Sequence, residues 1–134
     1  MITAIDSSIL IDVGLGASER APAAIRSVEE CAAQGPIVVC DVALVEVVPV
    51  LSEMVDPAAW FRDLGIAFDP VGEKAAIHAG RLHTRYLKRT KSRRRLVVDL
   101  LIGAHALFQA DQLLSRDRGY YRDYFQGLKL VEPR

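Results

Sequence analysis

Short, uninterrupted apolar runs recur along this sequence and are separated by segments that favour helices. Runs in which no polar residue alternates with the apolar ones are typical of parallel strands whose two faces are both covered. Strands that alternate with helices from end to end form an α/β fold. The sequence therefore predicts a three-layer α/β/α sandwich with a central parallel sheet. Its strands are expected at residues 2–5, 37–40, 66–68, 112–114 and 128–131.

Helix signals fill the intervals between these strands. Ser7 or Ser8 can cap the first helix, and Asp41 can cap the third. Pro49 lies inside the third helix, where it should kink the backbone beside Glu46. The helices are expected to begin near residue 9 and to cover 21–34, 41–55, a short stretch from 57, 72–88 and 97–110, with a short helix or turn after 117.

The length and composition are those of one globular domain. The 134 residues are 51% hydrophobic and 25% charged, which suits a single core and argues against disorder. No apolar stretch reaches the roughly 18 residues that a membrane span requires, and no secretion signal is recognisable. Cys31 and Cys40 lack a metal-type spacing and are expected to be buried thiols. We therefore expect one cytoplasmic domain over residues 1–134, with no membrane association.

Four acidic residues lie inside apolar runs or close to their ends. Asp6 and Asp117 each follow a predicted strand, whereas Glu46 and Asp99 are flanked by apolar residues in predicted helices. Buried carboxylates are costly without a compensating partner, and open parallel sheets bind ligands at the carboxyl ends of their strands. The four side chains are therefore expected to converge in one pocket at that edge. Four other aspartates are interpreted as helix caps or turn residues and not as members of this pocket: Asp12, Asp41, Asp69 and Asp111.

Convergence of four carboxylates has an energetic consequence. Two carboxylates about 4 Å apart repel by about 4 kcal/mol at an effective dielectric constant of about 20, so a cation is expected to neutralise them. A set of oxygen ligands without Cys or clustered His favours Mg²⁺ or Mn²⁺ over Zn²⁺. One or two such ions can activate water and stabilise the leaving oxygen of a phosphodiester. The pattern therefore predicts a hydrolytic metal site.

The formal net charge of zero conceals an uneven distribution. Residues 74–98 contain nine of the seventeen Lys and Arg residues and no acid. A basic flank beside an acidic site suits a polyanion. We interpret this stretch as an RNA-phosphate surface, while a solvated face or contact with an acidic partner peptide stays open. The candidate RNA-binding residues are Arg81, Arg85, Lys88, Arg89, Arg93, Arg94 and Arg95, and Tyr120 and Tyr121 could stack on a base.

Several blocks of the sequence resemble those of the PIN-domain ribonucleases, and the length is similar to that of VapC-type toxins from bacterial toxin–antitoxin pairs. The blocks are Ile-Asp-Ser-Ser at 5–8, Glu46 within its helix, Val-Val-Asp-Leu-Leu-Ile-Gly-Ala-His-Ala at 97–106, Leu-Leu-Ser-Arg-Asp-Arg-Gly-Tyr-Tyr at 113–121 and Gly-Leu-Lys-Leu-Val-Glu-Pro at 127–133. One departure is Asp41-Val-Ala, where relatives often have Ser or Thr.

The resemblance implies both a fold and an activity. It implies a parallel sheet of order 3-2-1-4-5 and Mg²⁺- or Mn²⁺-dependent endonuclease action on RNA, with 5′-phosphate and 3′-hydroxyl products. It also implies inhibition by a small antitoxin and frequent homodimerisation. The family's acidic quartet corresponds to Asp6, Glu46, Asp99 and Asp117. Its hydroxyl beside the site corresponds to Ser115, and Ser7 or Ser8 would support Asp6.

The leading hypothesis is therefore a metal-dependent endoribonuclease toxin. A non-catalytic RNA- or protein-binding module on the same fold is the alternative, and the intact quartet argues against it. A phosphoacceptor receiver domain is also doubly wound, but it needs paired acids after the first strand and a Lys after the last. Here Asp6 is followed by Ser7 and Leu114 by Ser115, so the sequence argues against this alternative.

Overall fold

A parallel five-stranded sheet forms the centre of the structure. The computed structural model describes the chain except residues 17 and 87–92, and it places the side chains of the described residues except 93–95 and 118. Within this part of the chain, the strands run in the order β3-β2-β1-β4-β5, and every neighbouring pair is parallel. The strands are β1 (Thr3–Ile5), β2 (Ile37–Val39), β3 (Ile66–Phe68), β4 (Gln112–Leu114) and β5 (Leu130–Val131).

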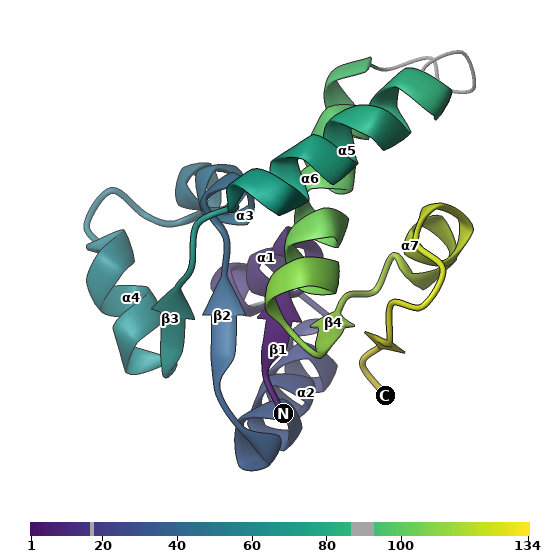
Figure 1. Cartoon of the computed structure of the whole chain (residues 1–134). Coiled ribbons are helices and arrows are strands. Elements are labelled where there is room, and N and C mark those ends of the chain that lie inside the picture. Colours follow the sequence, from purple (N-terminus) through teal and green to yellow (C-terminus); the bar gives the residue numbers. More distant parts are fainter. Residues whose placement is uncertain (17, 87–92) are drawn as a thin grey trace.

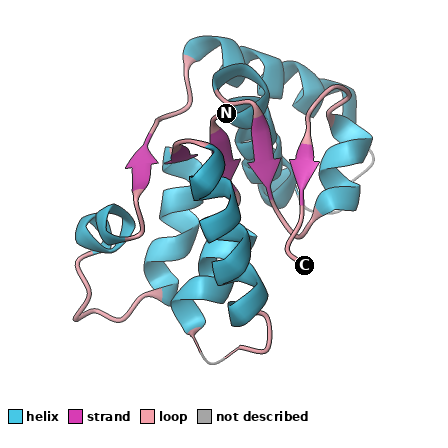
Figure 2. Ribbon diagram, turned by 90° about the horizontal axis from the view of Figure 1, so that it is seen from below, coloured by secondary structure: helices cyan, strands magenta, loops and turns pink. Residues whose placement is uncertain are grey.

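Helices cover both faces of this sheet. In Figure 1, α6 crosses in front of β1 and β4, while α1 and α2 lie behind the sheet; Figure 2 shows the same layers from below. The helical elements are α1 (Ser7–Leu15), α2 (Ala21–Gln34), α3 (Asp41–Val47), the 3-10 turn η1 (Val48–Val50), α4 (Pro57–Asp63), α5 (Glu73–Tyr86), α6 (Arg93–Gln109) and α7 (Arg118–Tyr124). The predicted α/β/α sandwich and the strand order implied by the resemblance are both confirmed.

The core lies on both faces of β1 and β4, whose residues are all buried. Ile5, Leu113 and Leu114 pack there against buried residues such as Leu100 of α6. A strand with both faces covered has no reason to alternate polar and apolar residues. This packing explains the uninterrupted apolar runs of the sequence.

The two cysteines are buried and unpaired, as expected. Burial raises the pKa of the Cys31 thiol above its ordinary value. It raises the pKa of Cys40 from 9.0 to about 11, because the thiolate would lose its hydration there. Both side chains are therefore protonated packing residues at neutral pH.

Three predictions about the helix that starts at Asp41 are wrong. The helix that starts at Asp41 ends at Val47 instead of continuing to about residue 55, and Pro49 lies in the following 3-10 turn. Proline has no backbone N–H to donate within a helix, so the segment stops there instead of kinking. Asp41 is the first residue of α3 and not its cap, and its Oδ1 accepts a hydrogen bond from the Val71 backbone N–H at 3.0 Å.

Ser7 and Ser8 do not cap α1 either. They are the first two residues of the helix, and Asp6 occupies the N-cap position. Their hydroxyl groups point to two acidic side chains instead, at distances given below. The predicted capping role is therefore wrong. Ser8, one of the two serines expected to support Asp6, does donate a hydrogen bond to it.

One face of α5 packs into the interior. Ala75, Ala79 and Leu82 are buried, and α5 packs along α6. Arg81 and Arg85 of the same helix are exposed. No helix within the described part of the chain is both long and apolar enough to cross a membrane.

Candidate active site

Asp6 stands at the point where β1 ends and α1 begins. Its backbone N–H donates to the Leu114 carbonyl at 3.0 Å, which fixes it beside β4. Only 2% of the residue is exposed. Oδ2 accepts hydrogen bonds from the hydroxyls of Ser8 and Ser115, both at 2.7 Å, and Oδ1 accepts one from the Tyr121 hydroxyl at 3.0 Å. Three hydroxyl donors thus compensate the burial of one carboxylate.

Glu46 is connected to the same region through Ser7. The Ser7 hydroxyl donates to Oε1 of Glu46 at 2.8 Å, and Glu46 itself is half-buried on α3. Consecutive residues at the start of α1 therefore contact the two acids: Ser7 contacts Glu46, and Ser8 contacts Asp6. The first turn of α1 lies between these acidic side chains.

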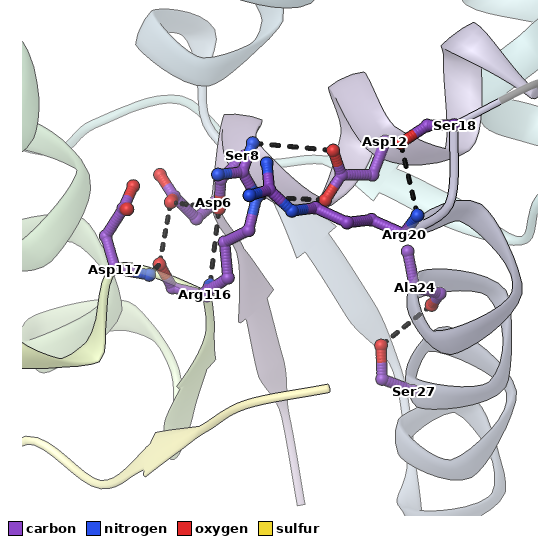
Figure 3. Close-up of polar contacts among 10 residues, drawn as sticks. Asp6, Ser8, Asp12, Ser18, Arg20, Ala24, Ser27, Arg116 and Asp117 are labelled. Carbon is purple, nitrogen blue, oxygen red and sulfur yellow. Dashed lines mark hydrogen bonds and ion pairs between the residues drawn. The ribbon is translucent and has the colours of Figure 1, made fainter. Parts of the chain in front are cut away.

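Ser115 joins Asp6 to the segment that follows β4. Its hydroxyl donates to Asp6 and accepts a hydrogen bond from the Asp117 backbone N–H at 2.9 Å. Asp117 is the N-cap residue of α7, but its side chain makes no cap hydrogen bond. Figure 3 shows Asp6 and Asp117 at the same end of β1 and β4. Ser115 therefore contacts both the Asp6 carboxylate and the backbone of Asp117.

Asp99 and Asp117 line one cavity. Asp99 comes from α6, and Asp117 comes from the loop between β4 and α7. The cavity has a volume of about 180 Å³, and the other described residues that line it are Arg116, Gly119 and Tyr120. Two carboxylates from separate elements of the fold therefore line one small, open space.

Tyr121 is buried where the charges of three of the acids act on it. Its pKa is raised well above the ordinary value of 10.0, first because the side chain is buried and then because Asp6, Asp99 and Asp117 oppose a negative phenolate. Only 1% of Tyr121 is exposed. The predicted stacking of Tyr121 on a base is therefore wrong, because the ring is inside the protein. The sequence signal for its actual position is its spacing of one helical turn from Asp117.

Asp12 and Arg116 form an ion pair that the sequence analysis missed. Arg116 Nε donates to Asp12 Oδ2 at 2.9 Å, and Nη2 donates to Oδ1 at 3.4 Å. Asp12 was interpreted as a cap or turn residue, yet it is buried in the middle of α1. It follows the apolar run Ile9-Leu10-Ile11, so the criterion that selected the other four acids also applies to it.

Asp69, another of the acids interpreted as caps or turn residues, connects the loop after β3 to α6. Its Oδ2 lies 2.9 Å from Nε2 of the buried His105 and accepts a hydrogen bond from Gln109 Nε2 at 3.1 Å. Asp111 accepts a hydrogen bond from the Ile2 backbone N–H.

The donor set is compatible with a hydrated hard cation. Among the described residues, no three Asp, Glu, His or Cys side chains are close enough together to form a ready-made ligand cluster. Mg²⁺ retains several water molecules and is held by as few as one or two carboxylates. Asp99 and Asp117, which share a cavity and present only oxygen, match that requirement. A closed cage made of protein ligands alone does not match the structure.

The basic candidates are described only in part. Arg81 and Arg85 are exposed on α5, and the Arg85 guanidinium lies 5.9 Å from the centre of the Tyr86 ring. Lys88 and Arg89 lie outside the described residues, as do the side chains of Arg93, Arg94 and Arg95. The RNA-binding role of the stretch stays a prediction.

A second hollow lies on another part of the molecule. It measures about 620 Å³ and is lined largely by apolar residues of α3, η1, α4 and β3, including Leu44, Phe61 and Phe68. It lacks converging carboxylates, since its one acid, Asp56, caps α4 by accepting from the Ala58 N–H. Hydrolytic chemistry is therefore better placed at the smaller acidic cavity.

Comparison with known proteins identifies relatives of this fold. Residues 3–125 match the PIN domain family. The VapBC2 complex from Rickettsia felis, bound to a DNA fragment from its promoter, is similar with a TM-score of 0.73 and 17% identity over 100% of both chains. VapBC-1 from Haemophilus influenzae has a TM-score of 0.67 and 17% identity over 98% of both chains. A toxin from Mycobacterium tuberculosis, VapC20, described as cleaving the sarcin–ricin loop, has a TM-score of 0.65 and 16% identity over 95% of this chain and 98% of its own. A search of curated protein sequences found no significant match.

Proposed function

Because this chain belongs to the PIN-domain family, we propose that it is a Mg²⁺- or Mn²⁺-dependent endoribonuclease and the toxin of a toxin–antitoxin pair. The observation that carries the proposal is that Asp99 and Asp117 line one cavity, while Ser115 joins the buried Asp6 to the backbone of Asp117. A globular domain has little reason to gather acids at one end of its sheet unless they serve a ligand.

The four acids have different roles in this proposal. Asp99 and Asp117 would hold one or two ions directly, because they share an open cavity. Asp6, whose oxygens already accept three hydroxyl hydrogen bonds, and Glu46 would act directly or through water. When bound, a divalent ion lowers the pKa of a coordinated water and neutralises charge on the phosphate.

The hydroxyl groups position these acids. Ser115 connects Asp6 to the backbone of Asp117, so the two acids that follow neighbouring strands keep a fixed spacing. Ser7 restrains Glu46 from α1 in the same way. Prior restraint of ligand side chains reduces the ordering required when ion and RNA bind.

The biological role rests on the similar structures. Two of them are VapBC complexes, and a third is described as an RNA-cleaving toxin. We propose by analogy that the chain acts in the cytoplasm, forms a homodimer and is inhibited by an antitoxin protein. The exposed arginines of α5, Arg81 and Arg85, would contribute to RNA binding.

A cleavage assay tests the enzymatic part. Asp99→Asn keeps the size of the side chain and removes its charge, so cleavage of RNA in Mg²⁺ or Mn²⁺ should fall at least about a hundredfold. Asp6→Asn should act similarly, with circular dichroism as a check on its folding. Asp63→Asn, which removes an exposed acid from α4, is the matched control and should leave the rate unchanged.

Two outcomes would contradict the proposal. Undiminished cleavage by Asp99→Asn, purified free of wild-type protein, would remove the acidic set from the reaction. RNA binding without cleavage in any divalent metal would instead identify a non-catalytic binding module.

A further inference from the structure

Arg116 lies between two residues of the candidate site and spans the distance from the acidic cavity to α1. It follows Ser115 and precedes Asp117, and its backbone N–H donates to the Ser8 hydroxyl at 3.4 Å. Figure 3 shows its side chain extending from the Asp117 side towards Asp12. Arg116 also lines the cavity that contains Asp99 and Asp117. The positively charged Arg116 side chain therefore lies at the edge of an acidic site.

The pair with Asp12 uses only one edge of the guanidinium. Nε and Nη2 donate to the two Asp12 oxygens, whereas Nη1 takes part in none of the hydrogen bonds that the structure describes. A guanidinium has five N–H donors in one plane. The Asp12 side chain is 5% exposed and the Arg116 side chain is 35% exposed. Asp12 thus fixes the orientation of the group from the inside, while donors stay available on the outside.

The negative charge of the cavity would hinder RNA binding unless a positive group such as Arg116 lies nearby. Asp99 and Asp117 repel a polyanion such as RNA, and Arg116 is positively charged and lines the same cavity. Arginine binds phosphate through two parallel N–H donors, and holding its fork in place reduces the ordering required on binding. Its free edge is therefore suited to a phosphate that enters beside the two acids.

We propose that Arg116 forms a binding subsite for an RNA phosphate beside the acidic cavity, with Asp12 as the positioning residue that orients its guanidinium. The inference rests on the proposed function for the identity of the ligand, but it concerns binding and not cleavage. A structural role is the competing explanation, since Arg116 also compensates a buried carboxylate. The two explanations differ in what happens when both charges are removed together.

The experiment measures RNA binding without cleavage. The probe is a fluorescein-labelled single-stranded RNA oligonucleotide, followed by fluorescence anisotropy in Ca²⁺, with a gel to confirm that the RNA stays intact. Arg116→Ala should weaken binding about tenfold, as expected for a lost charge-assisted contact. It should also make the slope of log K against log[salt] less negative by about 0.7, the value for one single-strand phosphate contact. Arg116→Lys should keep the slope and lose part of the affinity.

A double variant separates binding from folding. Arg116→Ala alone leaves the buried Asp12 carboxylate unpaired and should lower the melting temperature. Asp12→Asn combined with Arg116→Ala removes both charges, so the melting temperature should recover while RNA binding stays weak. Arg62→Ala is the matched control, because Arg62 is exposed on α4 beside β3, at the opposite edge of the sheet from β5. It should leave the salt slope unchanged.

Recovery of wild-type RNA affinity by the double variant would overturn the proposal, and so would an Arg116→Ala protein with unchanged affinity and slope. The result is independent of the nuclease assignment. If no metal supports cleavage but Arg116→Ala still loses affinity and slope, the nuclease proposal fails and the phosphate subsite stands. If Asp99→Asn abolishes cleavage while Arg116→Ala binds RNA with wild-type affinity, the phosphate subsite fails and the nuclease proposal stands.

Discussion

The hydroxyl of Tyr121 donates a 3.0 Å hydrogen bond to Oδ1 of Asp6, across 115 positions of the sequence. It ties α7 to the end of β1 and gives a buried carboxylate its third hydroxyl donor. The negative charges of Asp6, Asp99 and Asp117 help to keep the phenol protonated. The acids and the phenol therefore support each other: the phenol stabilises a carboxylate, and the carboxylates keep the proton on the phenol.

Tyr121→Phe should lower the free energy of unfolding by about 1–3 kcal/mol, because the buried Asp6 carboxylate loses a donor while the ring still packs. Urea unfolding measures this change. Tyr124→Phe is the control, since Tyr124 is half-buried on the same helix and its hydroxyl makes none of the described hydrogen bonds. Equal stability of the two variants would show that the Tyr121 contact does not stabilise Asp6.

Gly103→Ala should destabilise the protein by about 1–3 kcal/mol, the usual range for overpacking a core. A methyl group at Gly103 of α6 would overlap the ring of Phe125, which is itself buried. Gly80→Ala, in α5, adds the same methyl group where nothing lies within 4 Å. That variant should gain up to about 1 kcal/mol from helix propensity. Thermal unfolding of the pair measures the difference, and a shift of the same sign in both would contradict the packing described.

Cys40 should make the stability depend on pH in the alkaline range. Its pKa is raised from 9.0 to about 11 in the folded protein, so the unfolded chain ionises first. The stabilisation is complete below pH 9 and is lost as the pH rises towards 11, by about 2–3 kcal/mol in total. Tyr121 contributes in the same direction at higher pH, because its pKa is also raised.

Comparison of wild type with Cys40→Ala isolates the thiol, since both proteins keep Tyr121. Free energies of unfolding measured at several pH values above about 8 should fall more steeply for the wild type. Parallel curves would mean that the thiol ionises equally easily in the folded and unfolded states.

The backbone of this fold was largely predictable from the sequence. Strands at 66–68 and 112–114 and the helix at 21–34 begin and end at the predicted residues. Their signals are local: apolar runs for the strands, and Gly35-Pro36 after the helix. The error at Pro49 was also local, because a proline can kink a helix or end it.

The partners of the acids could not be predicted in the same way. Ser7 was interpreted as a cap because caps are the common local role of serine, but its partner Glu46 lies 39 positions away. Asp12 was interpreted as a cap or turn residue because Arg116 lies 104 positions away. Residue type and spacing indicate that a buried acid needs compensation, and only the folded structure identifies the group that provides it.

The most direct test of the central claim is calorimetric titration of Mn²⁺ into the wild-type protein and into Asp99→Asn, with RNA absent. We expect saturable binding of one or two ions to the wild type and at least about tenfold weaker binding to Asp99→Asn, because one of the two carboxylates of the cavity is lost. Absence of saturable binding to the wild type, or equal affinity in both proteins, would contradict the assignment of this acidic set as a metal site.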